Sequence, residues 1–312
     1  MPTFPQVPPT SVRGIWPPML LYWDAQWRLD QETTDANLDR QLASDPHGLY
    51  SLDTASEFFT LEFEDWQAVA RRFVKRCRSA APGLLLGLGC TWTHQEGALA
   101  RIRVARDLGV DTIHLSPPYW LPLNEDGLLR FLGAVQEVAG HLGVILYAPP
   151  HGKLTLSAAL YEKLARENPC VIGTKTEGLD ALLLAAPGGE RRHSHFVHES
   201  RVVNAARHGG LGIYSALAGV SMALMKHWWK LIEEGRWPEA VAIQDRVNRF
   251  YAQGVQPIRD RGILAGAIDK SMAQVGGAAG TRLMRPPYPS VPDDLFDGLL
   301  GAARRHLPEA FG

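Results

Sequence analysis

The chain has 312 residues, of which 46% are hydrophobic and 21% charged, a composition that excludes disorder over most of its length. Its 32 basic and 33 acidic residues leave a net charge of −1, which predicts no chain-wide attraction to nucleic acid or to a membrane surface. Three scattered cysteines exclude a disulfide framework and a zinc site of the paired-cysteine kind. With no export or membrane segment visible, we expect a cytoplasmic protein with small-molecule partners.

Eight short apolar runs rich in β-forming residues follow one another along the chain, and helix-like stretches separate most of them. Most of the runs begin roughly 30 residues apart, the period of a βα unit, although the last interval is shorter. Strands that alternate with helices pair in parallel, and eight of them favour a closed (β/α)8 TIM barrel over an open α/β sheet. The predicted strands are Gly14–Leu21, Gly48–Leu52, Gly83–Cys90, Asp111–Ser116, Gly143–Tyr147, Cys170–Thr174, His195–Val197 and Gly210–Ser215.

After Ser215 the pattern becomes purely helical. The first helix, Val220–Glu234, is expected to close the barrel, and two more, Pro238–Ala252 and Ile258–Val275, to follow it. The sequence therefore predicts a barrel over residues 12–235 and additional C-terminal helices over residues 236–312.

Lys175 is the residue most indicative of chemistry. It follows the apolar strand of the sixth unit, so it is expected at the C-terminal mouth of the barrel, where enzymes of this fold place their reacting groups. Burial there favours the neutral amine, lowers the lysine pKa and allows attack on a carbonyl to form a Schiff base. A solvated lysine at a strand end is the alternative.

Tyr147 ends the preceding strand, one βα unit before Lys175. Neighbouring parallel strands lie about 4.8 Å apart, so the two side chains are expected to share one substrate. A phenol beside an imine-forming lysine is a plausible proton shuttle. Simple packing at a strand end is the alternative.

Several segments in order resemble the dihydrodipicolinate synthase/N-acetylneuraminate lyase family of class I, Schiff-base aldolases. Tyr147–Pro150 resembles the family's Y-N-V-P, Gly173–Lys175 its G-x-K, and Asp53–Glu57 in part its G-T-T-G-E loop. Pro118–Trp120 is similar to its P-Y-Y segment, and Gly210–Ser215 to its eighth strand. The resemblance covers about residues 12–300.

The resemblance implies how the site works. Lys175 would condense with a 2-keto acid, typically pyruvate, while Tyr147 relays protons and the Thr54 hydroxyl links to the tyrosine. Main-chain N–H groups at Ala55 and Ser56 would hold the keto-acid carboxylate. The family usually forms homotetramers, so we expect a tetramer or dimer. We expect no cofactor, and no metal is required because the imine already supplies an electron sink.

Further substrate-binding residues follow from the same resemblance, and here the sequence departs from the synthases. Trp120 stands where they carry the second tyrosine of P-Y-Y, which a neighbouring subunit inserts into the relay; in the other register Tyr119 serves. Lys153 lies near their aldehyde-binding arginine, which is missing here. Ser215 ends the eighth strand. Each departure weakens assignment as a synthase more than it weakens Schiff-base chemistry.

Three other features are better explained without catalysis. His193, His195 and His198 lack further ligands at metal-binding spacing, so we expect a polar rim of the pocket rather than a metal site. The basic run over residues 71–78 lies on an amphipathic helix and predicts a solvated face rather than an RNA patch. Trp228 and Trp229 indicate packing rather than a ligand cage.

The sequence therefore predicts a Schiff-base 2-keto-acid lyase or aldolase acting on a keto acid and an aldehyde. Two alternatives remain within enzymes: 4-hydroxy-tetrahydrodipicolinate synthase itself, and a hydratase or dehydratase-aldolase on the same imine. A non-catalytic keto-acid-binding relative is the third, because the loop over residues 53–56 is altered.

Overall fold

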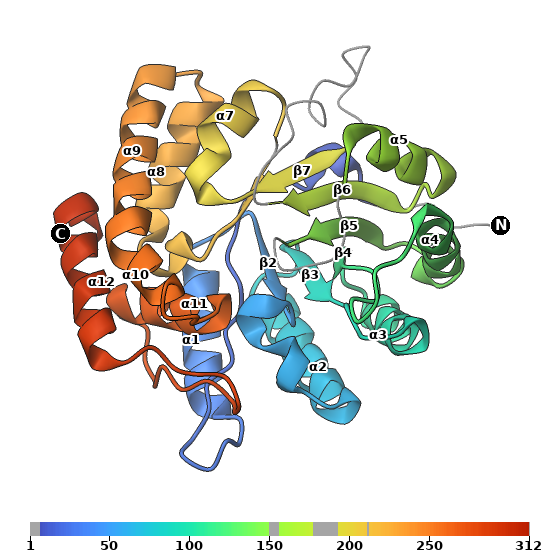
Figure 1. The fold of residues 1–312 in the computed structure, drawn as a ribbon, viewed down its shortest axis with the longest axis horizontal. Helices are drawn as coiled ribbons and strands as arrows, with labels where there is room; N and C mark the ends of the chain where they lie inside the picture. The colour runs from blue at the N-terminus through green and yellow to red at the C-terminus, as the bar shows by residue number, and fades with distance from the viewer. Residues whose placement is uncertain (1–6, 150–155, 177–192, 211, 312) are drawn as a thin grey trace.

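Eight parallel strands form a ring in the computed structural model, which describes residues 7–149, 156–176, 193–210 and 212–311 (Figure 1). Each strand falls in or next to a predicted apolar run, so the predicted strand count is confirmed. In chain order they are β1 (Gly14–Trp16), β2 (Gly48–Ser51), β3 (Leu85–Gly89), β4 (Thr112–Leu115), β5 (Gly143–Ala148), β6 (Val171–Thr176), β7 (Ser194–Val197) and β8 (Gly212–Tyr214).

The ring closes between its first two strands. Successive strands pair in parallel from β2 to β8, and β8 pairs with β1. At the seam, the Tyr50 N–H donates to the Pro17 carbonyl (3.3 Å) and the Met19 N–H donates to the Tyr50 carbonyl (2.7 Å). The predicted TIM barrel is therefore confirmed.

Large aromatic side chains fill the barrel interior because glycine lies beside them. A Cβ atom on Gly48 would lie 2.3 Å from the Trp16 ring, and one on Gly212 would lie 2.3 Å from the Phe196 ring. Both rings are fully buried and pack around Tyr214. The interior is thus a packed core, and ligands can enter only at its ends.

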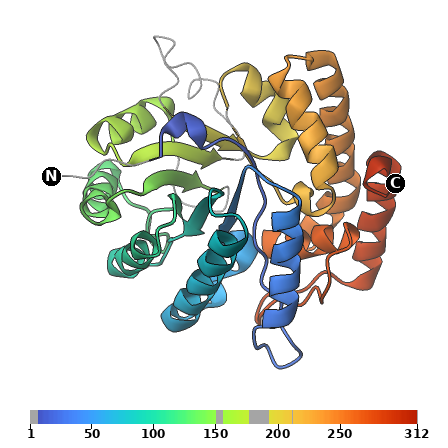
Figure 2. The ribbon, with the colours of Figure 1, turned by 180° about the vertical axis from the view of Figure 1, so that it is seen from behind.

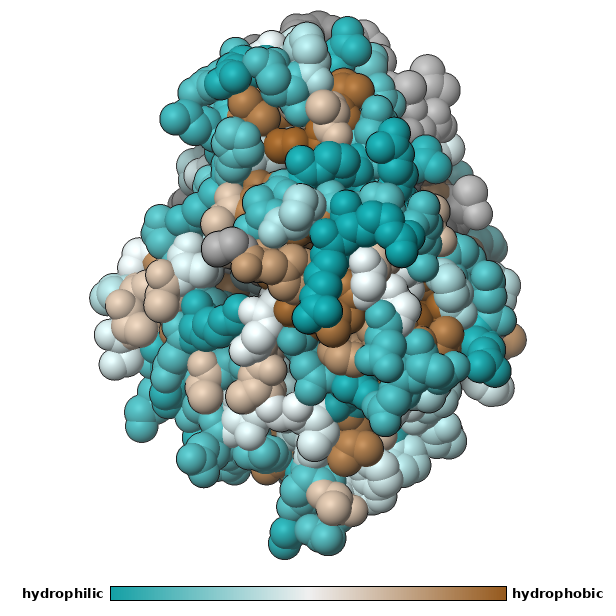
Figure 3. All heavy atoms as spheres, turned by 90° about the vertical axis from the view of Figure 1, so that its left-hand side faces the viewer, coloured by the Kyte–Doolittle hydropathy of each residue, from teal (hydrophilic) through white to brown (hydrophobic). Residues whose placement is uncertain are grey.

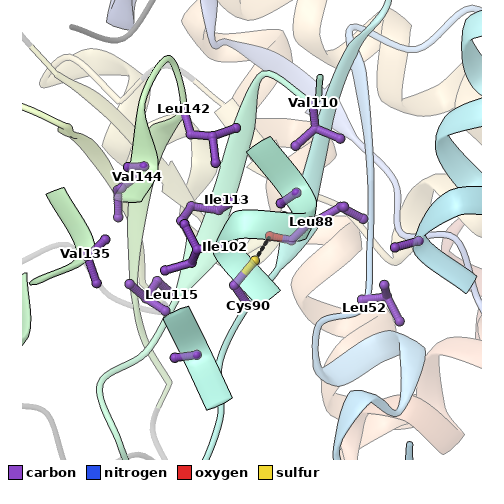
Figure 4. Packing of buried hydrophobic residues seen from close by; sticks show 14 of the residues in the cluster. Leu52, Leu88, Cys90, Ile102, Val110, Ile113, Leu115, Val135, Leu142 and Val144 are labelled. Atoms are coloured by element: carbon purple, nitrogen blue, oxygen red, sulfur yellow. Dashed lines mark hydrogen bonds between the residues drawn. The ribbon is translucent and has the colours of Figure 1, made fainter. Parts of the chain in front are cut away.

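An outer layer of helices covers the strands (Figures 1 and 2). Apolar side chains of β3–β5 interdigitate with those of the surrounding helices, as Figure 4 shows for Ile113 and Leu115 beside Ile102 and Val135. The helices are α1 (Gln31–Ala43), α2 (Phe63–Ala80), α3 (Gln95–Asp107), α4 (Glu125–Ala139), α5 (Ala158–Glu167), α7 (Val202–Arg207) and α8 (Met222–Glu233).

The C-terminal segment packs beside the barrel and reaches its mouth. It comprises α9 (Trp237–Phe250), a π-helical turn (Tyr251–Val255), α10 (Gln256–Arg259), α11 (Ala265–Val275) and α12 (Asp293–His306). α11 packs against the loop after β2, whereas the face of α9 and α12 is mainly hydrophilic with separated apolar patches (Figure 3). The domain boundary at residue 235 stays a prediction.

The expected helix over Ile258–Val275 is wrong, because the chain turns between α10 and α11. Gly262 has a φ of +74°, and its N–H donates to the Arg259 carbonyl while the Ile263 N–H donates to the Ile258 carbonyl. This is a Schellman motif, in which glycine ends a helix. Helix α12 lies outside the predicted helices, although two acidic residues begin it and three basic residues end it.

Two structural predictions on the outer layer are confirmed. Arg71, Arg72 and Lys75 of the basic run are exposed on α2, whose buried side is apolar, and Arg72 and Arg76 also pair with Asp35 on α1. Trp228 and Trp229 are buried among the apolar side chains between α8 and α9. Within the described ranges, no helix is both long and apolar enough to cross a membrane.

Candidate active site

A pocket of about 330 Å³ opens at the C-terminal ends of β2–β5, and the C-terminal segment closes one side of it. Its wall is mainly apolar, and Asp53 is the only charged residue among the described ones that line it. The lining residues are Asp53, Thr54, Phe58, Phe59, Thr91, Ser116, Pro117, Pro118, Tyr119, Pro122, Leu123, Leu128, Tyr147, Pro149, Leu264, Ala265 and Tyr288.

Lys175 and Tyr147 lie side by side, as the sequence predicts. The two residues are directly paired across β5 and β6, and the Lys175 Nζ lies 4.2 Å from the centre of the Tyr147 ring. Gly173 permits this register, because a Cβ atom there would lie 1.9 Å from the Ser194 carbonyl oxygen on β7. The rings of Tyr214 and Tyr50 complete an aromatic enclosure, 5.0 and 5.1 Å from Nζ.

Asp53, which the sequence analysis did not single out, is the closest partner of Lys175. The ammonium donates a hydrogen bond of 2.7 Å to Asp53 Oδ2, and the Asp53 side chain is only 3% exposed. The other carboxylate oxygen, Oδ1, accepts from the Thr54 N–H at 2.7 Å. Because the two residues are far apart in the sequence, no local pattern predicts that they form an ion pair.

This ion pair corrects the expected protonation of Lys175. Burial acts to lower the lysine pKa, as predicted, but the Asp53 carboxylate outweighs it and raises the Lys175 pKa well above the ordinary value. Burial acts to raise the Asp53 pKa, but the Lys175 charge and His114 hold it far below its usual range. The resting lysine is therefore an ammonium ion.

His114 lies beneath the ion pair and was also missed. It is fully buried on β4, with Nδ1 3.7 Å from Asp53 Oδ2 and its ring against Tyr50 and Tyr214. Burial lowers its pKa, so the ring is neutral at physiological pH. Neither ring nitrogen has a hydrogen-bond partner within the described part of the chain.

The loop after β2 places Thr54 in the pocket wall and turns Ser56 away from it. The Ser56 N–H donates to the Asp53 carbonyl, and its buried hydroxyl donates to the Met19 carbonyl at 2.6 Å. No donor of Ser56 therefore remains for a substrate carboxylate, contrary to expectation. Ala55 is left as the remaining main-chain candidate of the two.

Four further expected residues have different fates. Tyr119 lines the pocket, whereas the Trp120 side chain is 75% exposed on the same loop. Ser215 does not line the pocket: its buried hydroxyl donates to Glu199 at 2.9 Å and accepts from the Ala218 N–H. Lys153 lies outside the described residues.

Glu57 has a structural role. It is fully buried, forms an ion pair with Lys270 of α11, and accepts from the Trp23 Nε1–H at 3.0 Å and from the Arg285 N–H. Its backbone lies in the left-handed region (φ +54°), which these bonds stabilise. Glu57 thus ties the loop to the C-terminal segment.

The expectation that the histidines rim the pocket is wrong. His193 and His195 share a face, as the alternation predicts, but both rings pack against Tyr161 of α5 on the outer side of the barrel. His198 caps the following turn through Ser200. No group of three potential metal ligands occurs among the residues that the structure describes.

Comparisons with known proteins agree with this architecture. The model of the dihydrodipicolinate synthetase family matches residues 11–297. An uncharacterized DapA-like lyase from Thermococcus kodakarensis is 24% identical over 89% of this chain and 94% of its own length. A 4-hydroxy-tetrahydrodipicolinate synthase from Acidiphilium cryptum is 28% identical over 70% and 75%.

Solved structures show the same fold. The crystal structure of YagE from Escherichia coli K12, a protein of the dihydrodipicolinic acid synthase family in complex with pyruvate, superposes with a TM-score of 0.83. It is 20% identical in sequence and covers 95% of this chain and 99% of that one.

Proposed function

Because the chain belongs to the dihydrodipicolinate synthetase family, and is a lyase of that family, we propose that it acts through a Schiff base between Lys175 and a 2-keto acid of the pyruvate type. The observation that carries the proposal is the position of the Lys175 Nζ, held between Asp53 and Tyr147 where both line the pocket. The bond made or broken next is carbon–carbon or carbon–oxygen.

Each role follows from a contact. Lys175 attacks the keto carbon, and the imine then acts as an electron sink, so the bond cleavage needs no metal. Tyr147, whose ring touches the ammonium, relays protons to and from the substrate oxygen. Thr54 lines the pocket beside Asp53. The N–H of Ala55, the next residue of the loop, is proposed to bind the keto-acid carboxylate.

The second substrate is proposed to be an aldehyde with an apolar body. Phenylalanine, proline and leucine side chains make up most of the pocket wall, and no described lining residue is cationic. A carboxylate on the aldehyde would therefore lose its hydration without gaining a partner. Efficient condensation of aspartate semialdehyde, compared with aromatic aldehydes, would instead favour the synthase assignment that the relative from Acidiphilium cryptum suggests.

Borohydride trapping tests the proposal. Pyruvate and borohydride are expected to add one covalent adduct, which peptide mass spectrometry locates on Lys175, and Lys175→Ala is expected to abolish it. Lys226→Ala, which removes a lysine paired with Asp45 on the surface, is the control. An adduct on another lysine would refute the role of Lys175, and no adduct with a panel of 2-keto acids would favour a non-catalytic relative.

Assembly and location are also proposed here. Trp120, Leu121 and Leu123 are exposed apolar side chains beside the pocket, and their burial by a second copy of the chain favours the expected dimer or tetramer. Sedimentation velocity measures the assembly. All three cysteines are buried free thiols, which suits a reducing cytoplasm.

A further inference from the structure

The loop after β2 carries an acidic residue, Asp53, where the G-T-T-G-E pattern has glycine. We infer that Asp53 is a catalytic residue that takes a proton from Lys175 before the amine attacks and returns one when water leaves. This inference rests on the proposed Schiff-base function. It is carried by a direct contact, the 2.7 Å bond from Lys175 Nζ to Asp53 Oδ2.

The backbone holds the carboxylate in one orientation. Oδ1 accepts from the Thr54 N–H at 2.7 Å, so Oδ2 is the oxygen turned to the lysine. Behind the loop, β3 approaches so closely that a Cβ atom on Gly89 would lie 2.0 Å from the Leu52 carbonyl oxygen. The backbone at Asp53 is therefore held in place, and turning the carboxylate away from Lys175 would break its bond from the Thr54 N–H.

No other described group is as well placed to accept this proton. The titratable groups that face the ion pair are Tyr50, His114, Tyr147, Tyr214 and Asp269. The three tyrosines near Nζ present their rings to it, at 4.2 to 5.1 Å. His114 contacts Asp53, with Nδ1 3.7 Å from Oδ2, and Asp269 acts on the pair only through its charge.

The proton balance closes with Asp53 as the base at the lysine nitrogen and the acid at the leaving hydroxyl, and with Tyr147 as the relay between nitrogen and oxygen. The ammonium gives one proton to Asp53, and the neutral amine attacks the carbonyl carbon, forming the C–N bond while the carbonyl π pair moves to oxygen. That oxygen takes a second proton from the nitrogen, by way of Tyr147, to give the carbinolamine. Asp53 then protonates the hydroxyl, water leaves with the C–O pair, and the protonated imine remains beside the Asp53 carboxylate.

His114 has a supporting place in this arrangement. Its ring is fully buried and neutral, without a hydrogen-bond partner in the described residues, and its Nδ1 lies 3.7 Å from Asp53 Oδ2. A neutral imidazole N–H directed at Oδ2 would stabilise the carboxylate without offering a second positive charge. His114 is therefore a positioning residue, which acts through Asp53.

The test separates proton transfer from two simpler roles. Initial rates of pyruvate trapping by excess cyanoborohydride are measured against pH for the wild type, Asp53→Asn and Asp53→Gly. The amide of Asp53→Asn keeps an oxygen for the Thr54 N–H but cannot carry the proton, and the glycine of Asp53→Gly leaves space. Asp297→Asn, an exposed change on α12, is the matched control.

Both variants are expected to lose about 10²–10⁴-fold in the highest rate reached at any pH. The rising limb of the profile should also move to lower pH, because the ammonium loses its counter-ion. Added formate should restore part of the rate to Asp53→Gly, where it fits, and none to Asp53→Asn, where the amide fills the space.

Three outcomes overturn the inference. A profile that moves to lower pH with an undiminished maximum would make Asp53 a counter-ion only. Faster trapping by Asp53→Gly would show that the carboxylate hinders entry of the keto acid. Equal trapping rates in all variants would show that Asp53 has no role in the reaction. Absence of any Lys175 adduct in the wild type would instead refute the proposed function itself.

Discussion

Two lysines, Lys270 fully buried and Lys175 with its side chain 16% exposed, form ion pairs with two carboxylates of the same loop, yet the pairs differ in kind. Asp53 pairs with Lys175 at the pocket, and Glu57 pairs with Lys270 of α11. Glu57 also accepts hydrogen bonds from Trp23 and from the Arg285 main chain, and Lys270 donates to the Leu283 carbonyl as well. The second pair is thus saturated with hydrogen bonds and fully buried.

The pair at the pocket is less fully bonded. In the described residues Lys175 donates to Asp53 alone and otherwise meets aromatic rings, and Asp53 lines the pocket. The Lys175 ammonium can therefore give up Asp53 and react with a substrate. Lys270 cannot do the same, because it would have to leave a Glu57 carboxylate that is fully hydrogen-bonded and buried. Both lysines pair with a carboxylate away from bulk water, so pairing alone does not make a lysine reactive. The difference lies in the smaller number of hydrogen bonds that Lys175 makes and in the contact of its partner Asp53 with the pocket.

Replacing each lysine by methionine is expected to show the largest difference between the two pairs, in stability and in turnover. Lys270→Met strands a fully buried carboxylate and should lower the free energy of unfolding by about 3–5 kcal/mol. Lys175→Met should cost less, about 2 kcal/mol, because Asp53 borders the pocket and water can reach it; its turnover should be lost entirely. Urea titration and turnover of both variants measure this, and equal stability losses would contradict the distinction.

Asp269, a neighbour of the Lys175–Asp53 pair, is expected to make the stability of the protein depend on pH. Burial, followed by the charge of Glu199, raises its pKa from 3.8 to about 7. Between these values the folded state holds a proton that the unfolded state has lost, so Asp269 makes stability fall as pH rises through this window. Asp269→Asn should therefore be more stable than the wild type at pH 8, by on the order of 2 kcal/mol, and nearly equal to it near pH 3.

Denaturant titrations of both proteins at the two pH values check the Asp269 prediction. Asp297→Asn, exposed on α12, should change stability equally little at each pH. A difference between Asp269→Asn and the wild type that does not depend on pH would mean that folding leaves the pKa of the Asp269 carboxyl unchanged.

Ser215→Ala has the smallest expected effect. The hydroxyl donates to Glu199, so its loss should cost about 1–2 kcal/mol of stability. Turnover should stay within about twofold, because Ser215 does not line the pocket. If stability were unchanged and KM rose tenfold, the substrate-binding role first expected for Ser215 would be restored.

The local pattern of the sequence determined the architecture and the juxtaposition of Lys175 with Tyr147. Strand runs at a βα period imply a barrel, and two residues that end neighbouring parallel strands must meet at its mouth. Local sequence also marks the break at Gly262, where glycine ends a helix, and α12, which begins with acidic and ends with basic residues. Both could therefore have been predicted from the sequence.

Only the tertiary structure decided the protonation of the site and the direction of several side chains. Asp53 and Lys175 are 122 residues apart, and the sign of the lysine pKa shift depends on a distance that no local pattern encodes. His195 and Ser215 lie on strands or at their ends, where a shift of one residue exchanges the inner and outer faces. Which side chains form the site is therefore decided by contacts between residues far apart in sequence, and those contacts depend on how the chain packs.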